Sequence, residues 1–140
     1  MKFNVNQKDL QSSLNYCQGV IEKRSTLPIL SNVLLEAKDE NLKITATDLD
    51  LIFIQNISNI EISEEGETTT SCSIMYDIVR KFNNEKKINF NLVSENKINL
   101  ESDKSSSNLN CLKASEFPIT EENFNENEFV INSKKLLKLL

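Results

Sequence analysis

The chain of 140 residues contains no histidine and no tryptophan, and it has only two glycines and two prolines. Histidine is the side chain that most often acts as a general base near neutral pH, so its absence removes the usual partner of a catalytic nucleophile. Gly19 and Gly66 stand alone, which excludes a glycine-rich phosphate loop. The patterns G-x-S-x-G and H-E-x-x-H are also absent. The sequence therefore has no histidine-dependent catalytic site and no phosphate-binding loop.

Cysteine is scarce as well. Cys17, Cys72 and Cys111 are an odd number at wide spacing, without a C-x-x-C pair. This pattern argues against a disulfide framework and, since histidine is missing, against a zinc site. We expect buried free thiols in a cytoplasmic protein, with no metal and no cofactor.

Long apolar runs are missing too. Residues 1–6 lead directly into polar residues and contain no apolar segment of the kind found in a signal peptide. No stretch approaches the roughly 18 apolar residues that a membrane-spanning helix needs. We expect no association with a membrane.

Basic residues are fewer than acidic ones, 16 against 21, so the formal net charge is −5. A protein that binds DNA through specific contacts usually has a basic domain. A protein held on DNA by topology needs little contact affinity, so the acidic total does not exclude that kind of association.

What the sequence does contain is a regular order of strand and helix patterns. Phe3–Val5 predicts a short strand, and Asn6 is a suitable N-cap for a helix over residues 7–21. Apolar residues recur along this helix at spacings of 4, 3 and 4, which predicts a buried face of Leu10, Leu14, Cys17 and Ile21. The opposite face is polar and nearly uncharged, with Lys8, Gln11, Ser12, Asn15 and Gln18.

Strands rich in Ile, Val, Leu and Thr are predicted next, over residues 29–37, 42–47 and 51–57. The order then repeats with short strands over 60–63 and 68–71, a second helix, and strands over 88–93, 97–101 and 109–114. In the second helix we expect Ile74, Met75, Ile78, Val79 and Phe82 to point inward, and Asp77, Arg80 and Lys81 outward. The sequence predicts an α+β fold, a duplicated β-α-β-β-β unit with two helices packed on antiparallel sheets.

A longer repeat relates the two ends of the chain. Residues 3–14 can be laid over residues 129–140 at an offset of 126, with Phe, Asn, Lys and Leu coinciding. A sequence that restarts in this way predicts a second copy of its own domain. We expect a first domain over residues 1–119, a linker over 120–128 and the start of a second domain over 129–140, so that the chain is a fragment.

One pair of carboxylates could hold a metal ion. Asp48 and Asp50 form a D-x-D pattern, and in a strand both side chains would lie on one side, where they could bind Mg²⁺ in a phosphotransferase. The alternative is a hairpin turn in which aspartate side chains accept backbone N–H bonds. A lone D-x-D is common, and we favour the turn.

The basic residues indicate a second candidate site. The chain has only two arginines, and each has a lysine beside it, Lys23 with Arg24 after the first helix and Arg80 with Lys81 on the second. If the two helices pack side by side, both pairs can face the same way and contact phosphate groups. The alternative is two solvated basic spots.

Several spaced motifs resemble one known family. Residues 24–32, R-S-T-L-P-I-L-S-N, match R-x-T-L-P-I-L-x-N, while Thr47–Asp50 resembles T-D-L-[ED] and Glu116–Pro118 resembles [DE]-F-P. The opening Met1–Phe3 and the second-helix region 66–80 are similar as well. Together these motifs resemble the bacterial beta sliding clamp, the beta subunit of DNA polymerase III, over the whole chain.

The resemblance implies a non-catalytic processivity factor that encircles double-stranded DNA. In that family three such domains form a crescent, two crescents close head to tail into a ring, and the helices line the hole. It implies that Lys23, Arg24, Arg80 and Lys81 face DNA, through weak contacts without base readout. The pocket that binds the polymerase alpha subunit and the clamp loader would lie outside this chain.

The chain departs from the family at two places. Ser73 and Ile74 stand where clamps carry basic residues, so we expect the inner surface of the ring to be less positive here. The region of the predicted subunit interface, where family members often have arginines, contains Asp103, Lys104, Ser105 and Ser107. We expect the interface there, with its charge pairing altered.

Two other functions remain open from the sequence. One is an α+β protein-interaction module that associates through an exposed sheet edge, without DNA topology. The other is the Mg²⁺-dependent phosphotransferase that would use Asp48 and Asp50.

Overall fold

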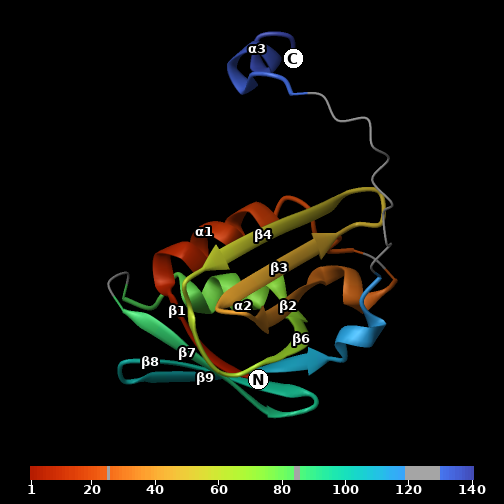
Figure 1. The fold of residues 1–140 in the computed structure, drawn as a ribbon. Coiled ribbons are helices and arrows are strands. Elements are labelled where there is room, and N and C mark those ends of the chain that lie inside the picture. Colours follow the sequence, from red (N-terminus) through yellow and green to blue (C-terminus); the bar gives the residue numbers. More distant parts are fainter. Residues whose placement is uncertain (25, 84–85, 119–129) are drawn as a thin grey trace.

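The computed structural model describes residues 1–24, 26–83, 86–118 and 130–140. Within these ranges nine strands form one antiparallel sheet, and two helices pack against each other and against that sheet (Figure 1). None of the helices in the described ranges is long and apolar enough to cross a membrane. The predicted α+β class is confirmed.

The first helix forms where the sequence predicts it. Strand β1 (Lys2–Asn6) leads directly into α1 (Gln7–Cys17), and Asn6 is the N-cap. Its side-chain oxygen accepts a hydrogen bond from the backbone N–H of Lys8 at 2.9 Å, which satisfies a donor that the helix itself leaves unpaired. The four residues of the predicted apolar face are all buried. The helix itself ends at Cys17, and Ile21 reaches the core from the turn that follows.

The two halves of the chain repeat one plan. After α1 the first unit continues as a meander of three strands, β2 (Asn32–Lys38), β3 (Asn41–Thr47) and β4 (Ile52–Ser58). The second unit has β5 (Glu61–Glu64), β6 (Gly66–Ser71), α2 (Cys72–Val79) and the meander β7 (Lys87–Ser94), β8 (Lys97–Ser102) and β9 (Ser105–Leu112).

In each unit, the strand that precedes the helix pairs with the meander of the other unit. β1 pairs with β7, whereas β6 pairs with β2. The sheet order in the described residues is therefore β4-β3-β2-β6-β9-β8-β7-β1-β5. Because each meander depends on a strand from the other half, the two units form one interlocked domain.

A short seam of threonines joins the two halves of the sheet. β6 and β9 pair only at Thr69 with Leu112 and at Thr70 with Cys111. The Thr69 hydroxyl donates to the Leu112 carbonyl at 3.1 Å, and the Thr70 hydroxyl donates to the Asn110 carbonyl at 2.9 Å. Both threonines are fully buried, so these bonds satisfy polar groups that would otherwise be costly in the core.

The apolar core runs through both units without a break. One cluster of buried residues contains side chains from α1, α2 and both meanders. Across the exchanged pair β1–β7, the rings of Phe3 and Phe90 stack with centroids 4.7 Å apart. Burial of this cluster therefore stabilises the exchange of strands and the position of both helices at once.

The starts of two strands differ most from the prediction. The strand expected from residue 29 begins at Asn32, because Pro28–Ser31 forms a 3₁₀ helix, η1. Proline favours the first helical position, and the Ser31 hydroxyl donates to the Pro28 carbonyl at 2.7 Å. β9 begins at Ser105 and not at residue 109, because it continues the hairpin with β8 through serines that have no strand-like pattern of their own.

The prediction that Ile74 points inward is wrong. Its side chain is 54% exposed, whereas that of its neighbour Met75 is completely buried. The inner face of α2 starts at Cys72 and continues at Met75 and Val79, spacings of three and four residues. Ile74 lies two residues after Cys72 and so falls on another side of the helix.

The predicted linker over residues 120–128 lies outside the described residues. Beyond it, the short helix α3 (Ser133–Leu137) begins after Asn132, whose side chain accepts a hydrogen bond from Lys134 N at 3.0 Å. The same cap joins Asn6 and Lys8, which lie 126 residues earlier.

The contrast between Met75 and Ile74 predicts two very different stabilities. Met75→Ala should lower the free energy of unfolding by about 2–5 kcal/mol, because it leaves a cavity in the core between the two units. Ile74→Ala should change it by less than about 0.5 kcal/mol, as is usual for an exposed position. Urea unfolding of the two variants measures both values. Equal losses would contradict the described face of α2.

Candidate functional site

The two main helices run antiparallel to each other. At one end of the pair, the side chain of Gln7 at the start of α1 donates to the carbonyl of Val79 at the end of α2, at 2.8 Å. At the other end, the Ser73 hydroxyl and the Gln18 side-chain oxygen are 3.2 Å apart. These contacts hold the helices in a fixed register, as the packing of α1 on α2 requires.

The outer face of α1 is polar and nearly free of charge. Lys8, Ser12 and Asn15 are exposed, as the sequence predicts. Gln11 and Gln18, which were expected beside them, are only partly exposed, because each bonds to a neighbouring side chain. Such a face can approach a polyanion through water without a strong contact at any one point.

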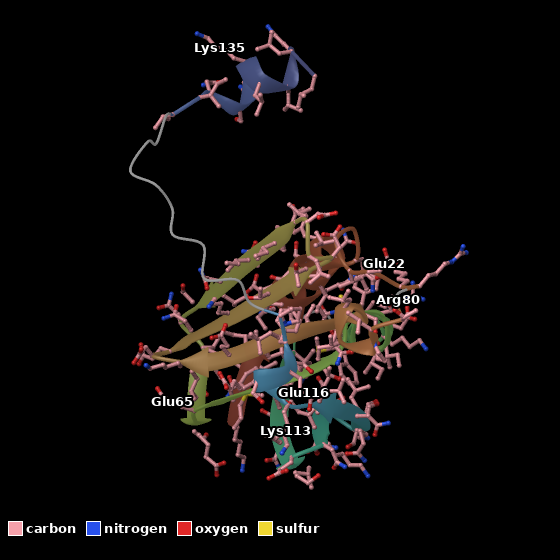
Figure 2. The ribbon with its side chains drawn as sticks, turned by 90° about the vertical axis from the view of Figure 1, so that its right-hand side faces the viewer. Glu22, Glu65, Arg80, Lys113, Glu116 and Lys135 are labelled. Carbon is pink, nitrogen blue, oxygen red and sulfur yellow. The ribbon has the colours of Figure 1, made fainter. Side chains whose placement is uncertain are left out.

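The basic residues lie at opposite ends of this helix pair. Lys23 and Arg24 follow the end of α1, and Arg80 and Lys81 follow the end of α2; all four are exposed. Since the helices are antiparallel, the two basic pairs are separated by about the length of α2, roughly 12 Å. Figure 2 shows Arg80 and Glu22 on the same side of the molecule, away from Glu65.

Arg80 is held in place by weak local contacts. Its guanidinium forms an ion pair with Asp77 at 3.2 Å, and it lies 5.9 Å from the centre of the Tyr76 ring. Both charged side chains are more than half exposed, so the pair contributes little to stability and can exchange for a phosphate group. Arg24 has its backbone N–H bonded to the Glu22 carboxylate at 2.9 Å.

Asp48 and Asp50 form a turn in the structure. One oxygen of Asp48 accepts the backbone N–H groups of Asp50 and Leu51, at 3.0 and 2.7 Å. Leu49 takes a left-handed conformation with φ of 83°, which such a turn accommodates. Among the described residues no group of three or more Asp, Glu, Cys or His side chains could hold a metal ion.

The four residues of the predicted interface lie in the turn of the β8–β9 hairpin and in the first part of β9. Asp103, with φ of 53°, and Lys104 form the turn, while Ser105 and Ser107 belong to β9. On one side β9 pairs with β8 from Ser105 to Asn110. On the other, within the described residues, it meets β6 only at its last two residues. The backbone of residues 105–110 therefore offers an open sheet edge.

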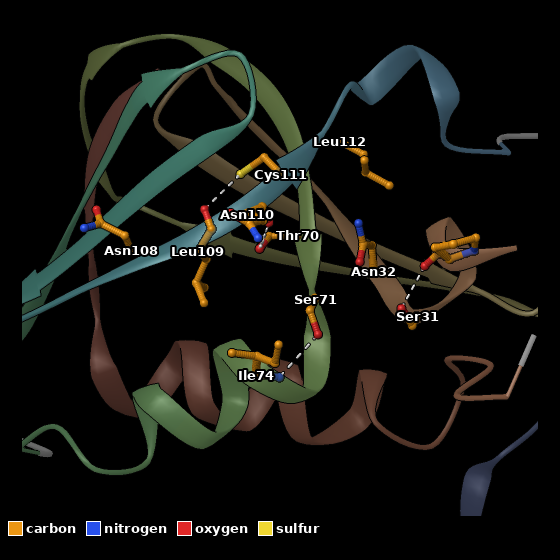
Figure 3. A pocket seen from close by; sticks show the side chains of 11 residues that line it. Ser31, Asn32, Thr70, Ser71, Ile74, Asn108, Leu109, Asn110, Cys111 and Leu112 are labelled. Carbon is orange, nitrogen blue, oxygen red and sulfur yellow. Dashed lines mark hydrogen bonds between the residues drawn. The ribbon is translucent and has the colours of Figure 1, made fainter.

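A groove lies beside this open edge. Its volume is about 310 Å³. It is lined by the end of η1, the end of β6, the start of α2 and the second half of β9, as Figure 3 shows. Ile74 is one of the lining residues, so the apolar side chain that the sequence analysis placed inward belongs to this surface. Its register on α2 relative to Cys72 is the signal that could have placed it there.

All three cysteines are buried and free, as predicted. Burial raises the pKa of the Cys111 thiol, which keeps it protonated and unreactive. Cys17 and Cys72 differ from it, because they lie together where the end of α1 meets the start of α2.

Comparisons with known proteins agree with each other. Residues 1–121 match the family model "DNA polymerase III beta subunit, N-terminal domain". The chain is 33% identical over 140 residues to the "Beta sliding clamp" of Pseudomonas aeruginosa and 31% identical to that of Escherichia coli K12. In both cases all of this chain is covered, and it spans 38% of the relative's length.

Solved structures show the same similarity in three dimensions. The Pseudomonas aeruginosa DNA polymerase III subunit beta has a TM-score of 0.93 and 32% identity, covering 99% of this chain and 37% of that one. Caulobacter crescentus pol III beta has a TM-score of 0.92 and 29% identity with the same coverage.

Proposed function

This chain belongs to the family of bacterial DNA polymerase III beta subunits, the beta sliding clamps, and we propose that it is the first domain of such a clamp. The protein would be a non-catalytic processivity factor of the replicative polymerase in the cytoplasm. It would encircle double-stranded DNA as a head-to-tail ring of two subunits. The observation that carries this proposal is a similarity that covers the complete chain in both sequence and fold.

The face of the α1–α2 pair is the surface that would be turned toward DNA. It is polar, and α1 offers only Lys8 and Asp9 as exposed charges. A ring that must slide cannot hold one position on the duplex, so weak and water-mediated contacts suit it. The net charge of −5 is compatible with this function, because topology and not contact affinity would keep the ring on DNA.

Lys23, Arg24, Arg80 and Lys81 would contact phosphate groups at the two ends of this face. Support comes from their exposure and from the weak Arg80–Asp77 pair, which costs little to break. The distance between the two basic pairs means that they would meet different phosphates. Contacts to the backbone position a protein on DNA without reading its sequence.

The subunit interface would form at Asp103, Lys104, Ser105 and Ser107. The open edge of β9 supports this, because its unpaired backbone groups can accept a strand from another subunit. Ile74 in the adjoining groove would add apolar contact.

The domain boundaries are part of the proposal. Residues 1–119 would form the first domain, 120–128 the linker and 129–140 the start of a second copy. The equivalent caps at Asn6 and Asn132, 126 residues apart, support this reading. The polymerase alpha subunit and the clamp loader would bind a pocket beyond these residues.

The other two functions receive less support. The open β9 edge would also suit a simple protein-interaction module, but that reading gives no reason for the similarity over the complete chain. A phosphotransferase is not supported, because the Asp48 carboxylate accepts backbone hydrogen bonds in a turn. In the described part of the chain, Asp48 and Asp50 have no third side chain beside them that could help to bind a metal ion.

Topological retention tests the function directly. The complete open reading frame is expressed, and its product is loaded on nicked circular DNA with a clamp loader and ATP. We expect the protein to stay on the circle and to leave when the circle is cut, because only a closed ring is lost through a free end. Equal retention on circular and linear DNA would indicate ordinary binding. Absence from both would favour the interaction module.

The basic residues can be tested in the same full-length protein. Arg24→Gln with Arg80→Gln should reduce the slope of log affinity for linear duplex DNA against log salt by about 0.9 for each lost phosphate contact. The control Lys97→Gln with Lys113→Gln removes the same charge from residues that belong to or follow the second meander. It should leave the slope unchanged. An equal decrease of the slope in both variants would show that DNA affinity depends on net charge alone and not on these arginines.

A further inference from the structure

Cys17 and Cys72 meet at the contact between the two main helices. Cys17 is the last residue of α1, and Cys72 is the first residue of α2. Both side chains are completely buried. They lie 55 residues apart in the chain, so that only the fold brings them together.

Several contacts fix this meeting point. The Cys72 sulfur is 3.8 Å from the carbonyl oxygen of Leu14, one turn before Cys17 on the same helix. The side chains of Cys17 and Cys72 also hydrogen-bond to each other. Next to them, the Ser73 hydroxyl is 3.2 Å from the side-chain oxygen of Gln18. A disulfide would bring the two sulfurs from their hydrogen-bond contact to a bond length of about 2.05 Å.

We propose that Cys17 and Cys72 form a redox-dependent disulfide that locks α1 to α2, with a low-molecular-weight disulfide such as glutathione disulfide as oxidant. Because both side chains are completely buried once the helices have packed, the exchange takes place while the chain folds. One cysteine thiolate attacks the oxidant, forms a mixed disulfide and releases one glutathione thiolate. The other cysteine then displaces the second glutathione. The two cysteines lose two electrons and two protons, and one glutathione disulfide becomes two glutathione thiols.

The pKa values of the two thiols are shifted in opposite directions. A hydrogen bond from Cys72 lowers the pKa of the Cys17 thiol, although burial opposes the effect. The pKa of Cys72 is raised, first by its bond to Cys17 and then by burial. Within the packed pair, Cys17 is therefore the more acidic thiol. Cys111 lies on β9 and bonds to Thr68 and Thr70, with no thiol among these partners.

The disulfide would act on the part of the molecule where the two units interlock. It would join the end of α1 in the first unit to the start of α2 in the second, close to Lys23. Cross-linking residues so far apart in the chain restricts the unfolded state strongly. The inference does not rest on DNA binding, and it can fail or hold independently of the proposed function.

The experiment is refolding in glutathione. The 140-residue chain is unfolded in urea, refolded in mixtures of reduced and oxidised glutathione, trapped with acid and digested with trypsin without reduction. The three cysteines fall in separate peptides, residues 9–23, 44–80 and 105–113. We expect the first two peptides to be joined with the loss of two hydrogens, and the third to keep a free thiol. Glutathione retained on Cys17 or Cys72, or all three pairings in similar amounts, would overturn the proposal.

Thermal unfolding gives a second readout with a matched control. Oxidised Cys111→Ser should unfold about 5–15 °C above its reduced form. Cys72→Ser should show no such difference between the two conditions. A shift that persists in Cys72→Ser would contradict the pairing. If Cys72→Ser does not fold, the peptide map of the unchanged chain still decides between the outcomes.

Discussion

The exchange of leading strands between the two units is the constraint on which the rest of the structure depends. β1 completes the meander of the second unit, and β6 completes that of the first. Each helix follows directly on its exchanged strand, so the exchange also places α1 and α2 beside each other. The hydrogen bond from the Asn32 amide to the Thr69 hydroxyl and the stacked rings of Phe3 and Phe90 stabilise the two exchanged strand pairs, β2–β6 and β1–β7.

The functional surfaces follow from this arrangement. The helices are antiparallel and are held at their ends by hydrogen bonds of Gln7 and Ser73. Their outer face is therefore continuous, and the two pairs of basic residues lie at opposite ends of it. Because β6 pairs with β9 only at Cys111 and Leu112, the first part of β9 has an open edge in the part of the chain that the structure describes. A single pattern of strand pairing thus gives one polar helical face, suited to a sliding contact, and one edge suited to assembly.

Much of the fold could be predicted from periodicity. The apolar spacing in α1 and its cap at Asn6 are local signals, and both are confirmed. The pairing of β1 with β7 could not be predicted, because no local pattern encodes a partner so far along the chain. Ile74 was misplaced because hydrophobicity was given more weight than its register on α2. For the candidate site, the sequence identified the basic residues but not their separation, which depends on the antiparallel packing.

The interlock is tested most directly by following each unit with its own probe during unfolding. The chain has no tryptophan and two tyrosines, Tyr16 on α1 and Tyr76 on α2. Tyr76→Phe leaves a reporter in the first unit, and Tyr16→Phe leaves one in the second. With tyrosine fluorescence followed in urea, two interlocked units should give the same midpoint and the same slope in both variants. Separate transitions would show that each unit folds without the other, which would contradict the account.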